Sequence, residues 1–575
     1  MKRALAVCAL VLVGAAAGGA PRVRSVRGVP VTGGIPDYPD MYECELGLPD
    51  PVLCSDGGPS HLSLSQAEVE AIVSAAARSL NVDTMTIAVV DRAGRPLALF
   101  RKPGADPADS YEAIGVARTA AFFSHNMAPL SSRTVRFISG IHFPPGITNT
   151  PSAALYGIEN TNRGCSLNVL FNPGKCLPRA RRFDTTARCA ATPAGTDTGG
   201  CGPGIVTGKR FPGDSDPASV NAGGIPLYRI LDASRVSDGI VRNGQLLGAI
   251  GVVGVPGDPQ RAEFAAASGA FGALGSANGP IAPVPSFPLP FPGNVFIDGI
   301  RLPFLGPDLR LEFNDDGLPT GLRRLEGTTA GNDTGTYVFA TENGGCTANE
   351  YLSGPTAGTF LTAAEVDGIV QRAIATARRT RAAIRLPANS FARMVIAVGD
   401  VDGTILALYR MPDSTVFSVD VAVAKARNVV WFSTSNDLPL GGTTAVTNRT
   451  IAFGGQPFFP SGIDSGVFDP RPGPWYVSLY QRDLANPCTQ GTQPTNRNQN
   501  GIVFFAGSTP LYRGGSLIGG LGVSGDGIEQ DDYVTYFGAG EFLPPSDIWA
   551  DRKFVDGVRL PMFKFPRQPE GVDEP

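Results

Sequence analysis

The chain repeats a strand–turn–strand pattern, and this repeat constrains the fold more than any other feature of the sequence. Ile87–Arg101 reads IAVVDRAGRPLALFR and Ile396–Arg410 reads IAVGDVDGTILALYR, so nine of these fifteen positions are identical without a gap. In both segments Asp and Gly lie between two apolar runs, which is typical of a hairpin turn. Each segment is therefore predicted to form two paired strands.

The segment before each hairpin repeats as well. Leu64-Ser65-x-x-Glu68 matches Leu361-Thr362-x-x-Glu365. Both are capping-box patterns, in which the hydroxyl and the carboxylate satisfy free N–H groups at a helix start. Apolar residues follow at the same helical spacings in both copies, which predicts an amphipathic helix with one buried stripe before each hairpin.

Further motifs recur in the same order after the hairpins. The matching pairs are Ala113–Ser124 with Ala422–Ser433, Pro226–Arg229 with Pro510–Arg513, Asn243–Gly254 with Gly514–Gly525, and Phe296–Pro303 with Phe554–Pro561. The first pair has the apolar spacing of a second helix, and the next two pairs are predicted to form strands. The repeat predicts two related domains at 60–305 and 355–565, joined by a connector at 306–354.

Two segments of the first copy fall outside the shared pattern. Residues 148–222 and 256–293 are rich in Gly, Pro or Ala, and we interpret them as insertions that form surface loops. The pairs Gly248-x-x-Gly251 and Gly519-x-x-Gly522 lie inside apolar strand patterns. They are interpreted as positions of close packing or bulges rather than as a phosphate-binding loop.

The first twenty residues have the layout of a secretory signal. Lys2 and Arg3 precede an apolar stretch and then a run of small residues, which leaves 21–59 as an N-terminal extension. A membrane anchor fits less well because the apolar run is shorter than about 20 residues. No later segment reaches that length, so we expect a secreted or periplasmic protein with no integral membrane segment in the mature chain.

Cysteine and charge fit an exported chain that does not bind nucleic acid. Without Cys8, eight of the nine cysteines remain, and an even number in an exported chain predicts disulfides. Proximity in sequence favours Cys44–Cys54, Cys165–Cys176 and Cys189–Cys201, which leaves Cys346–Cys488. Eight cysteines allow about 105 connectivities. The formal net charge of −4 gives no electrostatic footprint for nucleic acid.

Taken in order, these motifs resemble the GlcG/HbpS-type haem-binding (haem-degrading) domain family, in two tandem copies. The resemblance lies in the capped helix, the hairpin, the segment Ser418–Ala426, and the PLY motif with its Gly-rich strand. It implies an α+β fold of tandem profilin/PAS-like α/β sandwich domains, each with an antiparallel sheet and packed helices. Family members usually assemble as oligomers. The two copies are therefore expected to form an intramolecular pseudo-dimer, and a homo-oligomer of the chain stays open.

Haem needs an iron ligand, and the candidates are His125 and His142. His125 follows Phe122-Phe123-Ser124 at a predicted helix end, so it is our candidate metal ligand; the alternative is a polar residue that ends the helix. His142 lies in a loop, and its counterpart in the second copy is Phe458. Since the second copy contains no His, any haem bound there would need Tyr, Met or an oxygen ligand.

Basic residues on the second helix of each copy are candidates for the haem propionates. Arg118 and Arg427 occupy matching positions, and Lys425 lies beside Arg427. They can pair with carboxylates through charge-assisted bonds, or they can form structural ion pairs. No GxSxG motif or other catalytic constellation occurs, so we name no catalytic residue and leave enzymatic activity open.

The resemblance therefore implies an exported protein that binds haem or another tetrapyrrole and degrades haem slowly. The alternative is a secreted structural or interaction scaffold whose repeats no longer bind a cofactor. The scarcity of His, the insertions and the predicted disulfides favour that alternative. Titration of the mature chain with hemin would distinguish the two.

Overall fold

The structure is a computed structural model. It describes residues 23–25, 64–140, 152, 154–162, 205, 222–230, 244–285, 295–297, 300–338, 353–385, 390–434, 437–459, 471–485, 489–491, 493 and 498–570, apart from 93, 95, 298–299, 316 and 412. The predicted signal at 1–20, His142, every cysteine and most of the predicted insertion 148–222 lie outside these ranges. The predicted disulfides accordingly stay predictions.

The N-terminal unit, which we define as the described residues between 64 and 338, alternates helices and strands. Its main elements are α3 (Gln66–Ser79), β2 (Thr86–Asp91), β3 (Pro96–Arg101), α4 (Asp109–Phe123), α5 (Ser132–Gly140), β4 (Gly224–Ile230), β5 (Gly244–Val253) and α6 (Pro259–Ala270). Shorter elements are η2 (Ile158–Asn160), η5 (Phe271–Ala273), β6 (Ile281–Ala282), β7 (Phe296–Ile297), β8 (Ile300–Arg301), β9 (Leu311–Phe313), β10 (Pro319–Leu322) and β11 (Thr336–Val338).

The C-terminal unit, residues 353–570, has the same main order. Its elements are α7 (Ala363–Ala377), β12 (Val395–Gly399), β13 (Ile405–Arg410), α8 (Phe417–Thr434), α9 (Asn448–Gly455), β14 (Ser508–Arg513), β15 (Ser516–Ser524) and α11 (Ile528–Ala539). Shorter elements are η8 (Tyr476–Gln481), α10 (Arg482–Ala485), η9 (Gly540–Phe542), η10 (Ser546–Ile548), η11 (Ala550–Arg552), β16 (Phe554–Val555) and β17 (Val558–Arg559).

Each unit is built on an antiparallel sheet. The N-terminal sheet has the order β1-β11-β3-β2-β5-β4-β6, where β1 is Val23–Ser25, and the C-terminal sheet has the order β13-β12-β15-β14. The four strands β3-β2-β5-β4 thus lie in the same order as the whole C-terminal sheet. Register shifts occur at Leu227/Tyr228 and again at Leu511/Tyr512. The predicted α+β class with antiparallel sheets is confirmed.

The first helix of each unit begins at the predicted capping box. The backbone N–H of Ser65 donates to Glu68 Oε2 over 2.7 Å, and the backbone N–H of Glu68 donates to Ser65 Oγ over 3.4 Å. Thr362 and Glu365 make the same two bonds, at 2.9 and 3.2 Å. These bonds satisfy N–H groups that have no acceptor within the helix.

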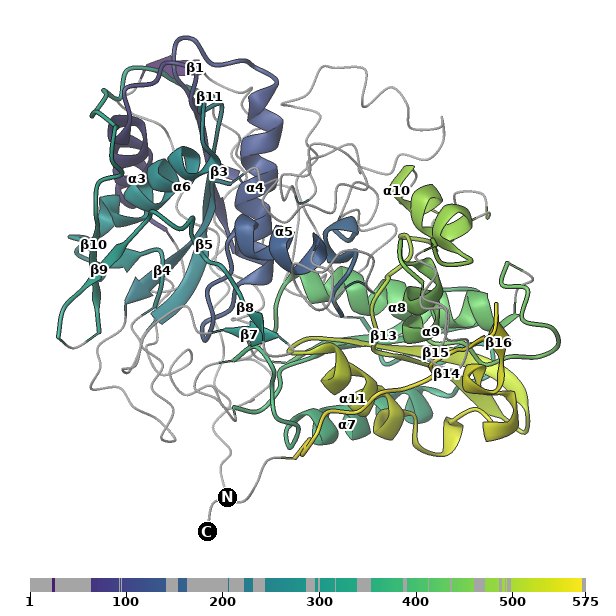
Figure 1. Cartoon of the computed structure of the whole chain (residues 1–575). Helices are drawn as coiled ribbons and strands as arrows, with labels where there is room; N and C mark the ends of the chain where they lie inside the picture. Colours follow the sequence, from purple (N-terminus) through teal and green to yellow (C-terminus); the bar gives the residue numbers. More distant parts are fainter. Residues whose placement is uncertain are drawn as a thin grey trace, which may run out of the picture.

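Helices cover both faces of each sheet (Figure 1). Helices α3 and α6 pack together on one face of the N-terminal sheet and α4 on the other, while α7 with α11 and α8 occupy the corresponding positions in the C-terminal unit. A Cβ atom on Gly251 would lie 2.1 Å from the carbonyl oxygen of Ala113, and one on Gly522 would lie 2.1 Å from that of Ala422. Glycine therefore lets α4 and α8 approach their strands, as the close-packing interpretation requires.

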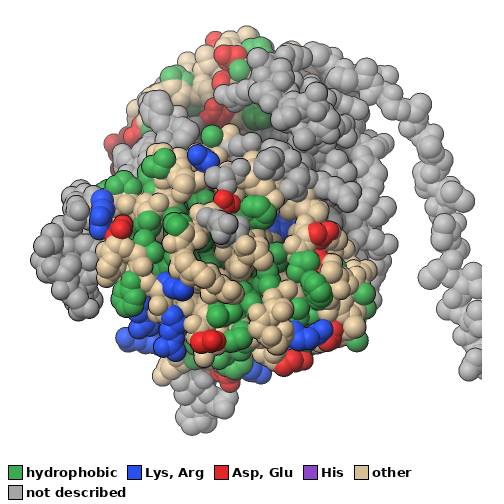
Figure 2. Space-filling model, turned by 90° about the vertical axis from the view of Figure 1, so that its right-hand side faces the viewer, with side chains coloured by type: hydrophobic (Ala, Val, Ile, Leu, Met, Phe, Trp, Pro, Cys, Tyr) green, Lys and Arg blue, Asp and Glu red, His purple; other side chains and the backbone are tan. Residues whose placement is uncertain are grey.

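The surface of the C-terminal side mixes apolar and charged groups. Figure 2 shows this face, where hydrophobic side chains lie among Lys, Arg, Asp and Glu side chains. Exposed Phe537, Phe554 and Phe565 belong to this unit. No helix in the described residues is long and apolar enough to span a bilayer.

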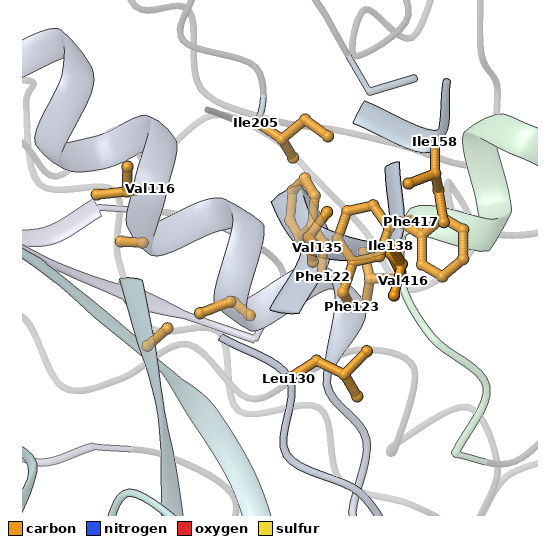
Figure 3. Close-up of a cluster of buried hydrophobic side chains, with 14 of the residues drawn as sticks. Val116, Phe122, Phe123, Leu130, Val135, Ile138, Ile158, Ile205, Val416 and Phe417 are labelled. Atoms are coloured by element: carbon orange, nitrogen blue, oxygen red, sulfur yellow. The ribbon is translucent and has the colours of Figure 1, made fainter. Parts of the chain in front are cut away.

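A hydrophobic cluster with residues from both units joins them (Figure 3). The rings of Phe123 and Phe417 stack with their centroids 4.1 Å apart and their planes 9° apart. Leu130 and Ile138 of the N-terminal unit and Val416 of the C-terminal unit belong to the same cluster. The helix-bearing inner faces of the two units therefore pack against each other through a shared core.

The structure differs from the predicted loop at 256–293. Residues 259–270 form α6, because Asp258 Oδ1 accepts the N–H of Gln260 over 2.8 Å and Pro259 suits the first helical turn. Phe264 and Ala265 are buried in the cluster that contains α3. The predicted connector also contains strands, and its β11 extends the N-terminal sheet beside β3. The Ala- and Pro-rich composition had concealed a helix that corresponds to α11.

Candidate functional site

An aromatic groove of about 410 Å³ lies between the two units. Residues 152–156 contribute one wall, and α9, residues 504–506 and residues 561–564 contribute the others. We call it the aromatic groove, and its ring-bearing lining residues are Tyr156, Phe453, Phe504, Phe505 and Phe563. Its volume lies within the range of about 300–1,000 Å³ that small-molecule sites occupy.

Two cationic side chains line the aromatic groove. Nε of Arg449 donates to Asp532 Oδ2 over 2.5 Å, whereas Nη2 of Arg449 is buried without a hydrogen-bond partner among the described residues. Lys564 is 65% exposed and pairs with Glu529. The groove thus combines apolar rings with an unsatisfied guanidinium N–H and an exposed ammonium group, a combination that suits an aromatic ligand with carboxylates.

The corresponding arginine of the N-terminal unit is fully paired. Arg133 donates from Nε to Glu263 Oε1 over 2.6 Å and from Nη2 to Glu263 Oε2 over 2.9 Å. Because Asp532 of the C-terminal unit also accepts the N–H groups of Gly507 and Lys564, it engages Arg449 only through Nε. The free Nη2 is therefore specific to the C-terminal unit.

A smaller cavity of about 100 Å³ adjoins the aromatic groove and shares Phe505 and Ile528 with it. We call it the Asp531 cavity. Its walls are mostly apolar and come from both units, including Phe123 and Phe417, and its polar end is formed by Asp531 and the start of α11.

Lys425 is fully buried and contacts Asp531. Its Nζ donates to Asp531 Oδ2 over 2.9 Å and to the carbonyl oxygen of Val523 over 2.7 Å, and it lies 4.9 Å from the ring centroid of Phe505. Burial raises the pKa of Asp531 to about 7, although Lys425 opposes this rise. Burial lowers the pKa of Lys425. Burial thus disfavours the charged form of each partner, while their mutual attraction favours it.

His125 is buried at the contact between the units and does not line either pocket. Its Nδ1 accepts the N–H of Met127 over 3.2 Å, so the remaining proton of the neutral ring belongs on Nε2, 4.0 Å from Asp526 Oδ1. Burial and the charge of Arg385 lower the pKa of His125 well below its usual value. Its role as an iron ligand stays a prediction, and this placement gives it no contact with the aromatic groove.

Arg118 and Arg427 are buried and make equivalent bonds to the hairpin turns. Nε of Arg118 donates to the carbonyl oxygen of Gly94 over 2.8 Å, and Nε of Arg427 donates to that of Gly403 over 2.8 Å. Burial lowers the pKa of Arg427 to about 9. Neither residue lines the aromatic groove. Their predicted pairing with propionates is untested, and the observed bonds hold the hairpins against the helices.

The structure thus brings together residues that sequence analysis did not select. Arg449, Lys564 and Asp531 were not named as site residues, whereas their neighbour Lys425 was. One signal was available: the second copy has Lys425 where the first has Val116. Its significance depends on Asp531, which is 106 residues away in sequence.

The groove fits the ring and the carboxylates of a haem better than its iron. No group of three or more His, Cys, Asp or Glu side chains that could hold a metal ion occurs in the described part of the chain. The described lining residues of the groove include no His, Cys or Met, and burial raises the pKa of the Tyr156 hydroxyl well above its usual value. The described residues therefore supply ring contacts and cations but no ordinary axial ligand.

Comparison with known proteins finds a family match within the C-terminal unit. Residues 361–539, which run from the start of α7 to the end of α11, match the family described as haem degrading protein HbpS-like. This match supports the predicted resemblance for the second copy.

Two curated proteins are similar to a part of the chain. The corrinoid adenosyltransferase PduO of Citrobacter freundii is 30% identical over 152 residues, and that of Salmonella typhimurium is 29% identical over 152 residues. Each alignment covers 26% of this chain and 33% of the relative, so the chain spans about a third of the length of these curated relatives.

Two solved structures are also similar over part of the chain. Klebsiella pneumoniae protein ORFY is 20% identical, with a TM-score of 0.21, and the match covers 31% of this chain and 86% of that one. A structure described as the PduOC:heme complex is 19% identical, with a TM-score of 0.20, and the match covers 36% of this chain and 100% of that one.

Proposed function

We propose that this protein binds a tetrapyrrole that carries carboxylates, such as haem, in the aromatic groove. The observation that carries the proposal is Nη2 of Arg449: the residue lines the groove, and this atom is buried without a partner among the described residues. A buried donor without an acceptor costs free energy, so a ligand carboxylate at this position would be strongly favoured.

The rest of the groove suits the same ligand class. Phe453, Phe504 and Phe563 offer apolar rings to a planar macrocycle, and Lys564 can pair with a second carboxylate. The match of residues 361–539 to the haem degrading HbpS-like family supports a tetrapyrrole over other aromatic acids. Export and slow haem breakdown belong to this proposal without assigned residues.

The test is a titration of the purified chain with hemin and, separately, with metal-free protoporphyrin. Because the described groove residues hold the ring and carboxylates, we expect both compounds to bind with affinities within about tenfold of each other. Arg449→Gln should weaken both by about tenfold. Arg133→Gln is the matched control and should leave both affinities unchanged. The absence of any spectral change with either compound would refute the proposal.

His142→Ala tests the iron ligand separately. If His142 binds iron, this variant shifts the Soret band of the hemin complex and leaves the protoporphyrin affinity unchanged. His125→Ala should not shift the band, since His125 lies outside the groove. A Soret shift for His125→Ala alone would place the haem at the contact between the units instead.

We also propose that the two units derive from one duplicated domain and pair as a pseudo-dimer. The shared order of four strands, the register shifts at matching positions and the common core of α4 and α8 support this proposal. Fusion would supply within one chain an interface that homo-oligomers make between chains.

A second candidate function is a secreted interaction scaffold. It is favoured by the N-terminal unit, where the arginine that corresponds to Arg449 is fully paired with Glu263. Exposed Phe537, Phe554 and Phe565 would then contribute to protein contacts. The titration decides between the candidates, because a scaffold without a cofactor binds neither hemin nor protoporphyrin.

A further inference from the structure

The buried pair Lys425–Asp531 has an apolar counterpart in the same chain. Lys425 corresponds to Val116 on α4, and Asp531 corresponds to Ala262 on α6, so both partners are replaced together in the N-terminal unit. Buried ion pairs are often no more stable than apolar residues of similar size. The N-terminal unit forms the same fold without an ion pair at this position. Stability alone therefore does not explain why the C-terminal unit has Lys425 and Asp531 there.

Asp531 has one oxygen that the pair does not use. Oδ2 accepts from Lys425, whereas Oδ1 is buried without a hydrogen-bond partner among the described residues. Asp531 is 2% exposed and lines the cavity. An unsatisfied buried acceptor at the end of an apolar cavity indicates a ligand with a hydrogen-bond donor.

The start of α11, which lines the same cavity, carries backbone donors. Helix α11 begins at Ile528, and the N–H of Asp531 donates to the carbonyl oxygen of Gly527 over 2.8 Å. The N–H groups of residues 528–530 have no acceptor within the helix, and no side chain caps this end. In the N-terminal unit, Asp258 caps the corresponding helix and Pro259 removes one N–H. The cavity therefore offers both an acceptor and adjacent donors.

We propose that the Asp531 cavity binds a short-chain carboxylic acid. The acid and Asp531 would share one proton between their carboxyl groups, while the acid's second oxygen accepts from the backbone at the start of α11. Lys425 balances the remaining negative charge. The cavity of about 100 Å³ is smaller than the engineered cavity of about 150 Å³ that admits benzene, so it suits a tail of a few carbons.

The shared proton gives binding a defined pH dependence. The charged groups around Asp531 are Lys425 on α8, Asp526 before α11, and Asp532 and Glu529 within α11. Burial also raises the pKa of Asp526 and Asp532. Asp526 is paired with Arg385, Asp532 with Arg449 and Glu529 with Lys564, so Asp531 is the carboxyl that takes up the proton. Because the pKa of Asp531 is about 7, an ionised acid binds without proton uptake below that value and must take up one proton above it.

The test is calorimetric titration of the full chain with isobutyric acid and with isobutyramide, its neutral analogue. The affinity for the acid should fall about tenfold from pH 6 to pH 8, whereas that for the amide should change by less than about threefold. An affinity for the acid that does not change with pH would overturn the shared proton.

Substitutions of Lys425 and Asp531 test whether the acid binds in the Asp531 cavity. The double variant Lys425→Val with Asp531→Ala reproduces the pair of the N-terminal unit, and it should lose at least about tenfold in affinity for the acid. Asp531→Asn is a second variant if the first fails to fold, and it should remove the pH dependence. Unchanged binding in a folded variant would refute the proposal.

Phe453→Ala separates this inference from the tetrapyrrole proposal. Phe453 lines the aromatic groove and not the Asp531 cavity, so this variant should retain the affinity for isobutyric acid. A chain that binds the acid but not hemin would uphold the cavity and refute only the proposed function. The converse result would refute only the cavity.

Discussion

At the scale of single residues, Asp413 joins the two units. Its Oδ1 accepts from Nη2 of Arg92 over 2.9 Å, and its Oδ2 accepts from Nη1 of Arg385 over 2.6 Å. Burial alone would raise the pKa of Asp413, but the guanidinium groups of Arg385 and Arg92 hold it well below its usual range. One carboxylate thus neutralises a cation from each unit, and its removal leaves both without this partner.

We expect Asp413→Ala to lower the free energy of unfolding by about 3–5 kcal/mol, because it leaves buried charges without their carboxylate. The effect should appear at neutral pH and diminish in strong acid, since a carboxylate with a lowered pKa contributes stability that is lost as pH falls below its ordinary pKa of 3.8. Urea unfolding at pH 7 and at about pH 2.5 measures both. Exposed Asp547→Ala is the control, and an equal loss in the two variants would contradict the prediction.

Asp531 should have the opposite pH effect. Its pKa is raised from an ordinary 3.8 to about 7, so the folded chain binds its proton more tightly than the unfolded chain. This contribution to stability is complete below about pH 4 and is lost as pH rises through 7. Lys425→Val with Asp531→Ala should therefore flatten the pH dependence of the urea midpoint between pH 5 and pH 8. An unchanged slope would show that the carboxyl titrates normally.

At the scale of elements, the same capping box has different surroundings in the two units. Glu68 also pairs with buried Arg229 over 2.9 Å, whereas the corresponding pair of Glu365 and Arg513 lies near the surface. The caps themselves were predictable, because a capping box is a local pattern of four residues. The burial was not predictable, because it depends on Ser276 and on strands far away in sequence.

Glu68→Ala should accordingly lower the free energy of unfolding by about 3–5 kcal/mol, since it removes a helix cap and leaves Arg229 buried without its carboxylate. Glu365→Ala is the matched comparison and should destabilise the fold clearly less, because its pair with Arg513 lies near the surface. Thermal unfolding of both variants measures the difference. Similar losses would mean that the cap, and not the buried pair, determines the effect.

The same distinction explains how much of the fold and site the sequence predicted. Helix starts and hairpins followed from local patterns and are confirmed. Helix α6 was missed because its Ala-rich sequence lay in a stretch that looked like an insertion. Arg449 and Asp531 were missed as site residues because their importance depends on an unpaired atom, which only packing decides.

At the scale of the whole molecule, the shared core predicts that the two units unfold together. Phe123 and Phe417 stack across the contact, and both belong to one buried cluster. A core of this kind is a large apolar interface rather than a loose contact between domains. The unfolding of one unit would expose the inner face of the other.

Tryptophan fluorescence can test this coupling. All three tryptophans, Trp431, Trp475 and Trp549, lie in the C-terminal unit. Phe123→Ala in the N-terminal unit should lower the free energy of unfolding by about 3–5 kcal/mol. It should shift the unfolding midpoint measured by tryptophan fluorescence as much as the midpoint measured by circular dichroism. A fluorescence midpoint that stays at the wild-type value would mean that the units unfold independently.

The difference between the two units also determines how many ligand molecules one chain can bind. Two identical subunits related by symmetry would present every pocket twice, whereas here Val116, Ala262 and the fully paired Arg133 occupy the positions of Lys425, Asp531 and Arg449. A ligand that is bound by Lys425, Asp531 or Arg449 should therefore saturate at one molecule per chain. Stoichiometry, measured before any affinity, would show whether duplication in this protein doubled a site or released one copy from having it.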